Sequence, residues 1–125
     1  MRILLDTQVL LWWLASDRRL DGAATQIIGD PANQVFISPA SIWEVSIKRH
    51  RGRLEAPDDF VDYVERERFE TVNVTAHHGW SAGALPMHHR DPFDRLLVAQ
   101  ALSENLTLMT SDGALRRYDV DILEI

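Results

Sequence analysis

Residues 91–112 run Asp91-Pro92-Phe93-Asp94-Arg95-Leu96-Leu97-Val98-Ala99-Gln100-Ala101-Leu102-Ser103-Glu104-Asn105-Leu106-Thr107-Leu108-Met109-Thr110-Ser111-Asp112, and this stretch decides the fold. Proline at a first helical position predicts a helix over Pro92–Glu104. The apolar run Leu106–Met109 predicts a buried strand directly after that helix. Helices that alternate with apolar strands are typical of a parallel sheet covered on both faces.

The same alternation continues along the rest of the chain. We expect further strands at Arg2–Leu5, Gln34–Ile37, Thr71–Val74 and Asp121–Glu124. We expect further helices at Thr7–Ala15, Leu20–Ile28, Pro39–Arg51, Pro57–Arg68, Ala76–Leu85 and Gly113–Tyr118. The sequence therefore predicts a compact α/β sandwich.

The composition is that of an ordinary globular protein, with 46% hydrophobic and 26% charged residues. A length of 125 residues predicts a single domain, residues 1–125. The longest apolar run, Val9–Ala15, is far shorter than the roughly 20 residues of a membrane span, so we expect no membrane contact. Arg2 leads into a core strand rather than a signal peptide. The absence of cysteine excludes thiolate metal sites and suits the cytoplasm.

The net charge of -6 argues against nucleic-acid binding by bulk charge alone. Basic residues are nevertheless clustered at Arg18-Arg19, Lys48–Arg53 and Arg116-Arg117. Such local patches can hold a phosphate backbone on an acidic protein, especially if metal ions neutralise part of its acidic surface.

Acidic residues recur where apolar strands end. Asp6 follows the first strand, Asp112 follows the fourth, and Asp94 lies at the third position of the helix over Pro92–Glu104. The carboxyl ends of parallel strands converge on one crevice, and Glu44 lies in an apolar stretch that we expect to be buried. Carboxylates gathered there repel one another, so they take up protons or hold a divalent cation. The pattern predicts a metal-dependent enzyme.

Each of these acids also has a purely structural explanation. Asp6 and Asp112 are good helix N-caps, although Thr7 could cap its helix and leave Asp6 free to point into the crevice. Glu44 and Lys48 have the spacing of a helical ion pair. Caps and ion pairs would have to account for all of the acids at once, so we favour a shared site.

Proline at the first helical position makes Asp91 the expected N-cap and places Asp94 one turn further on. Acids spaced three apart share a helix face, so both can line the crevice. The candidates for orienting water or phosphate are Thr7, Thr110, Ser111 and Arg95.

The five histidines do not predict a zinc site. His77-His78 and His88-His89 are adjacent pairs, whose side chains would point about 100° apart on a helix. The sequence contains no HExxH or comparable ligand spacing. Carboxylate ligands favour hard cations, so we expect Mg²⁺ or, as an alternative, Mn²⁺.

These segments, in this order, resemble the PIN-domain ribonucleases, specifically the VapC-type toxins of prokaryotic toxin–antitoxin pairs. The resemblance covers essentially the whole chain and rests on four segments: Ile3–Thr7, Ile37–Glu44, Asp91–Ala101 and Leu108–Asp112. The third segment is the specific one. The acidic quartet of the family corresponds to Asp6, Glu44, Asp94 and Asp112.

The resemblance implies a PIN-like three-layer sandwich, with a central parallel sheet of about five strands covered by helices on both faces. It implies a Mg²⁺-dependent endoribonuclease that hydrolyses RNA phosphodiester bonds as the toxin of a type II pair. Asp6, Asp94 and Asp112 would hold the metal, and Glu44 would complete the cluster and orient water. It also implies a homodimer and a small antitoxin protein as partner.

Two alternatives stay open at this point. One is a PIN-like binding module that docks a partner without catalysis. The other is a Mg²⁺-binding phospho-acceptor receiver-like domain, which usually places two acids together after the first strand and a lysine at a late strand end. Here Asp6 stands alone, and the only lysine, Lys48, is expected in a helix, so we favour the nuclease.

Overall fold

Five parallel strands form one sheet in the computed structural model, which describes residues 1–125. The strands are β1 (Arg2–Leu5), β2 (Gln34–Ile37), β3 (Glu70–Thr71), β4 (Thr107–Thr110) and β5 (Ile122–Glu124), in the order β3-β2-β1-β4-β5. β1 is the central strand, and its Leu4 is in register with Phe36 of β2 and Leu108 of β4.

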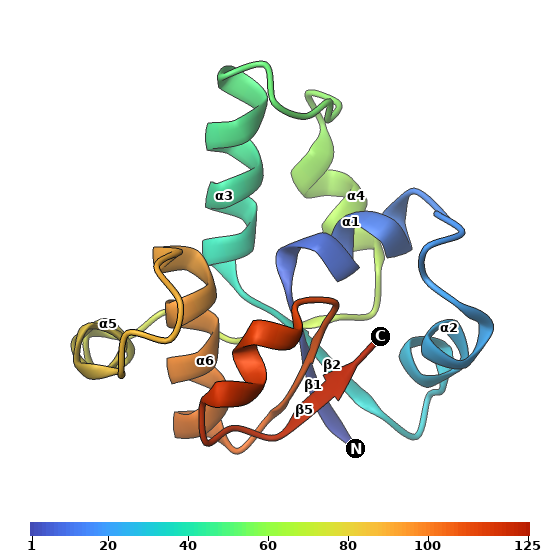
Figure 1. Ribbon diagram of the computed structural model, residues 1–125. Coiled ribbons are helices and arrows are strands. Elements are labelled where there is room, and N and C mark those ends of the chain that lie inside the picture. The colour runs from blue at the N-terminus through green and yellow to red at the C-terminus, as the bar shows by residue number, and fades with distance from the viewer.

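Helices cover both faces of this sheet (Figure 1). One face carries α1 (Thr7–Leu14), α2 (Gly22–Gly29) and α4 (Phe60–Arg66), and the other carries α6 (Pro92–Glu104) and the 3-10 helix η1 (Gly113–Arg117). α5 (Ala76–Ala84) packs on α6, and α3 (Pro39–His50) contacts both α1 and α6. None of these helices combines the length and the apolar composition that a membrane span requires.

The alternation of side chains along β1 divides the core in two. Ile3 and Leu5 belong to a cluster with α1 and α2, whereas Leu4 belongs to a cluster with α6. All three side chains are completely buried. Burial of a side chain of this size contributes roughly 1.5–3 kcal/mol before conformational entropy is counted. The predicted three-layer α/β sandwich with a parallel sheet is confirmed.

Most of the predicted elements lie where expected, and β1, β2 and α6 match residue for residue. α2 begins at Gly22 rather than Leu20, because the Asp21 carboxylate caps it by accepting the Ala24 N–H. The helix expected over 57–68 is the shorter α4, because residues 58–59 form a turn.

The third strand was expected at Thr71–Val74 but lies at Glu70–Thr71. Its partner β2 ends at Ile37, which pairs with Thr71, so the ladder cannot extend further. The strand order also makes the receiver-domain alternative wrong, because a flavodoxin-like sheet has the order 2-1-3-4-5.

Candidate metal centre

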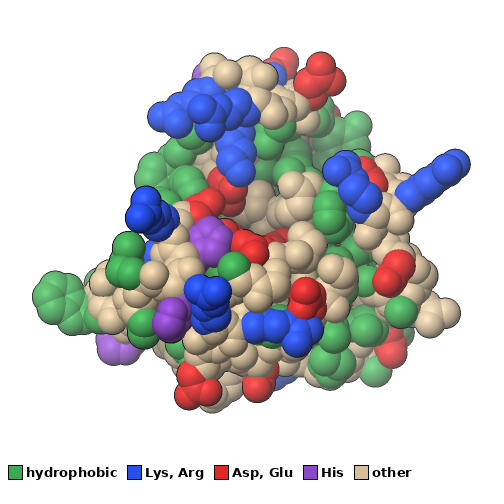
Figure 2. Space-filling model, viewed as in Figure 1, with side chains coloured by type: hydrophobic (Ala, Val, Ile, Leu, Met, Phe, Trp, Pro, Cys, Tyr) green, Lys and Arg blue, Asp and Glu red, His purple; other side chains and the backbone are tan.

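An acidic cavity of about 520 Å³ lies at the carboxyl ends of β1 and β4. The N-termini of α1 and α6 and one side of α3 contribute to its walls. All the acids predicted from the sequence line it: Asp6, Glu44, Asp91, Asp94 and Asp112. Figure 2 shows acidic side chains at the floor of a hollow, with basic side chains around it. The sheet thus gathers acids that are far apart in the sequence.

Asp6 is both the N-cap of α1 and part of the cavity. Its Oδ1 accepts the Val9 N–H at 2.8 Å, and its Oδ2 accepts the Thr110 hydroxyl. The alternative in which Thr7 caps α1 and leaves Asp6 free is therefore excluded, because Thr7 is already the first helical residue. Burial raises the pKa of Asp6, and the two hydrogen bonds lower it by a smaller amount. The charges of Glu44 and Asp112 raise it further.

Glu44 is held by two groups from different directions. The Thr7 hydroxyl donates to its Oε1 at 2.7 Å, and Lys48 Nζ lies 2.5 Å from its Oε2. The ion pair considered from the spacing is therefore present, and hydrogen bonding to Glu44 raises the pKa of Lys48. Glu44 is 5% exposed, but Trp43 beside it is 63% exposed. The expectation of a largely buried α3 holds only for the side of the helix that carries Ala40, Ser41, Glu44 and Val45.

The two acids at the start of α6 have different surroundings. Asp91 is the N-cap, as expected, and its Oδ1 accepts the Phe93 N–H at 2.8 Å and the Asp94 N–H at 3.4 Å. No backbone N–H or hydroxyl donates to the Asp94 carboxylate. Burial, with the charge of Asp91 next in importance, raises the pKa of Asp94 to about 7 even though His89 acts to lower it.

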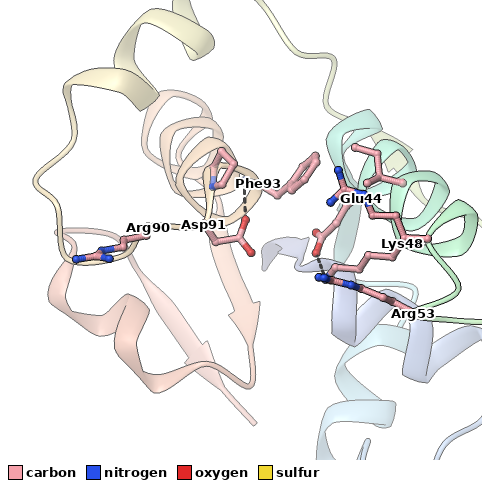
Figure 3. A pocket seen from close by; sticks show the side chains of 9 residues that line it. Glu44, Lys48, Arg53, Arg90, Asp91 and Phe93 are labelled. Carbon is pink, nitrogen blue, oxygen red and sulfur yellow. Dashed lines mark hydrogen bonds and ion pairs between the residues drawn. The ribbon is translucent and has the colours of Figure 1, made fainter.

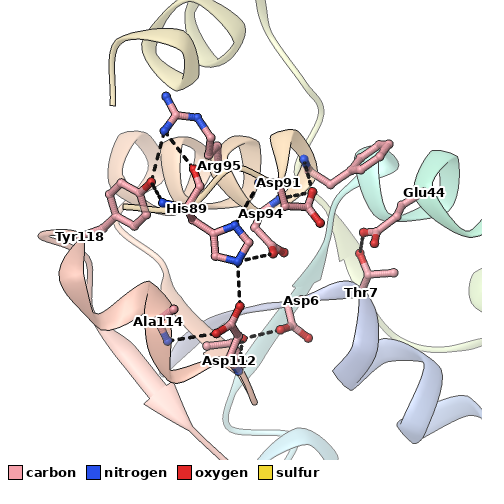
Figure 4. Close-up of polar contacts among 12 residues, drawn as sticks. Asp6, Thr7, Glu44, His89, Asp91, Asp94, Arg95, Asp112, Ala114 and Tyr118 are labelled. Atoms are coloured by element: carbon pink, nitrogen blue, oxygen red, sulfur yellow. Dashed lines mark hydrogen bonds and ion pairs between the residues drawn. The ribbon is translucent and has the colours of Figure 1, made fainter. Parts of the chain in front are cut away.

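Asp112 caps η1 and also contacts a histidine. Its Oδ1 accepts the Ala114 N–H at 3.0 Å, and its Oδ2 lies 2.9 Å from His89 Nε2. The same Nε2 lies 3.4 Å from Asp94 Oδ2. His89, Asp94 and Asp112 each offer one ligand atom, and these atoms lie within 4.8 Å of one another (Figure 4). The set of groups is thus not purely carboxylate.

His89 was not identified from the sequence, because His88 and His89 were expected to lie next to each other on a helix, where their side chains diverge. Residues 88–90 instead lie in the loop before α6, where the spacing rule for helices does not apply. The Asp91 N–H donates to His89 Nδ1 at 3.0 Å, so in the neutral ring the proton is on Nε2. His89 therefore donates from Nε2 toward the carboxylates. The sequence did offer one signal: His89 lies only two residues before Asp91, the expected N-cap, and therefore close to the acids at the start of α6.

Arg95 does not face the cavity, and the expectation that it orients phosphate is wrong in this structure. It is 7% exposed, and its guanidinium donates to backbone carbonyls of Ala82, Leu85 and Pro86 at 2.9–3.0 Å. It also donates to the Tyr118 hydroxyl at 3.2 Å. Arg95 therefore anchors the loop between α5 and α6, which carries His89.

The hydroxyl candidates divide by their surroundings. Thr110 is completely buried, accepts the Asp112 N–H at 3.0 Å and donates to Asp6. Thr7 is likewise buried and donates to Glu44. Ser111 lines the cavity. Thr7 and Thr110 therefore position carboxylates, and among these hydroxyls only that of Ser111 is available to a bound molecule.

The charge in the acidic cavity is not balanced by the protein. Its basic lining residues are Arg19, Lys48 and Arg53. Arg19 is already paired with Asp17, and Lys48 is paired with Glu44. An excess of carboxylates in a partly buried space is what a hard divalent cation with oxygen ligands compensates. The acidic cavity can therefore hold such a cation.

Comparisons with known proteins agree with this geometry. The family model described as PIN domain matches residues 3–121. The chain is 31% identical over 119 residues to Ribonuclease VapC22 of Mycobacterium tuberculosis (strain ATCC 25618 / H37Rv), covering 93% of this chain and 91% of that protein.

Solved structures share the fold at lower identity. VapBC2 from Rickettsia felis, bound to a DNA fragment from its promoter, matches with a TM-score of 0.74 and 16% identity, covering 99% of this chain and 98% of that chain. VapBC-5 from Mycobacterium tuberculosis, a member of the VapBC family of toxin–antitoxin systems, matches with a TM-score of 0.61 and 19% identity, covering 99% and 98%. At these identities the likeness is one of fold.

Proposed function

This chain belongs to the PIN domain family, and on that premise we propose that it is a metal-dependent endoribonuclease acting as the toxin of a type II toxin–antitoxin pair. One observation carries the proposal, which is that acids from separate segments converge on one cavity: Asp6, Glu44, Asp94 and Asp112. The similarity to a ribonuclease along most of the chain supports the same activity. A binding module without catalysis would not need this concentration of costly buried charge.

The donor groups fit a hard divalent cation. Burial and the neighbouring charges of Asp91, Asp6 and Glu44 raise the pKa of Asp94 more than His89 lowers it, so a cation beside this carboxylate would stabilise its charged form. We propose Asp6, Asp94 and Asp112 as ligands and Mg²⁺, or Mn²⁺, as the ion. When bound, the ion supplies Lewis-acid stabilisation of the charge that develops on the phosphate and lowers the pKa of water.

The protein residues have separate tasks in this proposal. Glu44 orients the attacking water, since its carboxylate is fixed by Thr7 and Lys48. We propose the same carboxylate as the general base that accepts the proton of this water. Thr110 fixes the Asp6 carboxylate in the same way. Asp91 acts as the cap of α6 and keeps its second oxygen toward the cavity. Fixed donors of this kind hold the carboxylates in place before the substrate binds.

The proposal extends to the biological setting. We propose one functional domain, residues 1–125, that acts in the cytoplasm on RNA and forms a homodimer. A small antitoxin protein is the proposed inhibitor, supported by the likeness to a member of the VapBC toxin–antitoxin systems.

The test is RNA cleavage by the purified protein, with Mg²⁺ or with excess chelator. Asp94→Asn should abolish cleavage while the protein stays folded, with a cooperative thermal transition. Asp62→Asn is the matched control, because Asp62 is exposed and outside the cavity. Cleavage that persists in chelator, or in Asp94→Asn at the rate of the control, would contradict the proposal.

A further inference from the structure

A second, basic cavity adjoins the acidic cavity. It has a volume of about 320 Å³ and lies between the C-terminal half of α3, the turn after it and the start of α6. Glu44, Lys48, Arg53 and Asp91 line both cavities, so the two form one continuous depression. Figure 3 shows Lys48 and Arg53 extending from the α3 side and Phe93 reaching across from α6.

The end of α3 presents two arginines to this basic cavity. Gly52 adopts a φ of +70°, and the Arg53 N–H donates to the Lys48 carbonyl at 2.9 Å, as at many helix ends. This turn brings Arg51 and Arg53 to the same cavity wall. Both are exposed, and neither guanidinium makes a hydrogen bond or an ion pair within the protein.

Some of the other surface arginines are already paired. Arg49, the neighbour of this turn, pairs with Asp58, and Arg116 pairs with Glu124. Arg51 and Arg53 are therefore free positive charges on a protein whose net charge is -6. A polyanion approaching this protein would be attracted at such a place and repelled by most of the remaining surface.

Aromatic side chains adjoin the two arginines. Phe93 lines the basic cavity. The exposed Trp43 lies outside that lining, beside the cavity, and meets the Phe93 ring edge to face with ring centroids 5.3 Å apart. Trp43 and Ile47 of α3 and Arg51, its C-cap, are spaced four apart, so they lie along one side of the helix. An exposed tryptophan and a half-buried phenylalanine lie beside free arginines here, and accessible aromatic rings with arginines are the combination that binds single-stranded nucleic acid, by base stacking and phosphate contacts.

We infer that the basic cavity binds the nucleotide next to the scissile phosphate of a single-stranded RNA, with its phosphate at Arg51 and Arg53 and its base against Trp43 and Phe93. This inference rests on the proposed function, because it assigns the scissile phosphate to the adjoining acidic cavity. An acidic peptide would satisfy the arginines, but it offers no base to stack on the aromatic pair.

The test measures binding of a fluorescent single-stranded RNA of about twelve nucleotides, in chelator so that no cleavage occurs, across a salt series. The double variant Arg51→Gln/Arg53→Gln should lower the affinity by about tenfold and flatten the slope of log K against log salt by about 1.4. The matched control is Arg68→Gln/Arg117→Gln, which removes the same charge from exposed arginines outside both cavities.

A second pair of variants tests base stacking on the aromatic side chains. Trp43→Ala should weaken RNA binding by about tenfold without changing the salt slope, since stacking is lost and no charge is removed. Trp80→Ala removes an equally large ring that is 83% exposed on α5, and it should leave the affinity unchanged. Both tryptophans are exposed, so neither variant removes core packing.

The possible outcomes separate this inference from the proposed function. RNA affinity that is equal in the double variant and its control overturns the inference, even if the protein cleaves RNA with Mg²⁺. Loss of affinity for a poly-aspartate peptide, with RNA affinity unchanged, also overturns it. A difference from the control supports it, and if the wild type binds RNA without ever cleaving it, the proposed function alone fails.

Discussion

His89 Nε2 lies 2.9 Å from Asp112 Oδ2, although twenty-three positions separate the two residues in the chain. The Asp91 N–H occupies the other ring nitrogen, so the imidazole can donate to Asp112 while it is neutral. His89 thereby links the loop before α6 to the strand end at β4. It also lies beside Asp94, so one ring contacts two of the acids proposed to hold the metal.

Substitution His89→Ala should reduce the cleavage rate by about 10–100-fold, the usual cost of removing a group that orients a metal-binding side chain. Asp112 would keep only the Ala114 N–H as a donor. His88→Ala is the control, because the His88 ring packs on Tyr118 and is not part of the carboxylate cluster. Steady-state cleavage rates of the two variants would decide the point, and equal rates would show that the His89 contact is incidental.

Arg95→Met should destabilise the protein by about 2–4 kcal/mol, because the buried guanidinium is lost and the loop carbonyls of Ala82, Leu85 and Pro86 lose their donor. Arg117→Met, at an exposed position, should change the free energy of unfolding by less than about 0.5 kcal/mol. Urea unfolding of both variants measures the difference. If Arg95→Met were as stable as the control yet inactive, the guanidinium would have the phosphate-orienting role that the structure does not show.

Much of the fold is predictable because its signals are local. An apolar run followed by an N-cap acid defines β1 and α1, and Pro92 after Asp91 defines the start of α6. The convergence of the acids follows from one rule, that the carboxyl ends of parallel strands share an edge. The positions of these acids could therefore be predicted without knowing the conformation of any loop.

The positions of His89 and Arg95 depend on a loop without periodicity. The segment between α5 and α6 is held by tertiary hydrogen bonds to Arg95 and Tyr118, and neither contact has a sequence signature. Arg95 was a candidate for orienting water or phosphate, but the helix turns its guanidinium toward the loop carbonyls instead. Tertiary contacts, not local propensity, decide such side chains.

Thr7→Val should test how far Glu44 depends on its hydroxyl donor. Valine fills nearly the same volume but leaves Glu44 Oε1 without a donor, which should cost about 1–3 kcal/mol in stability and reduce the cleavage rate. Thr7→Ser keeps the hydroxyl and should retain most of both. Thermal unfolding and single-turnover cleavage of the two variants supply the comparison, and a fully active Thr7→Val would exclude a positioning role for this hydroxyl.

Asp94 gives the metal-free protein an unusual dependence on pH. Its pKa is raised from 3.8 to about 7, so between those values the folded state binds more protons than the unfolded state. The free energy of unfolding should therefore fall as the pH rises from about 4 to about 7 and level off above that. This is opposite in sign to the usual effect of a carboxylate whose pKa is lowered by a partner.

A divalent cation must displace the same proton, so Mn²⁺ should bind more tightly as the pH rises toward about 7. Calorimetric titration at several pH values measures this, and thermal unfolding in chelator measures the stability. Asp94→Asn cannot titrate at this position, so it should remove most of the pH dependence from the metal-free protein. If the wild type and Asp94→Asn lost stability in parallel with rising pH, the proton would reside elsewhere, with Asp6, whose pKa is also raised, the next group to substitute.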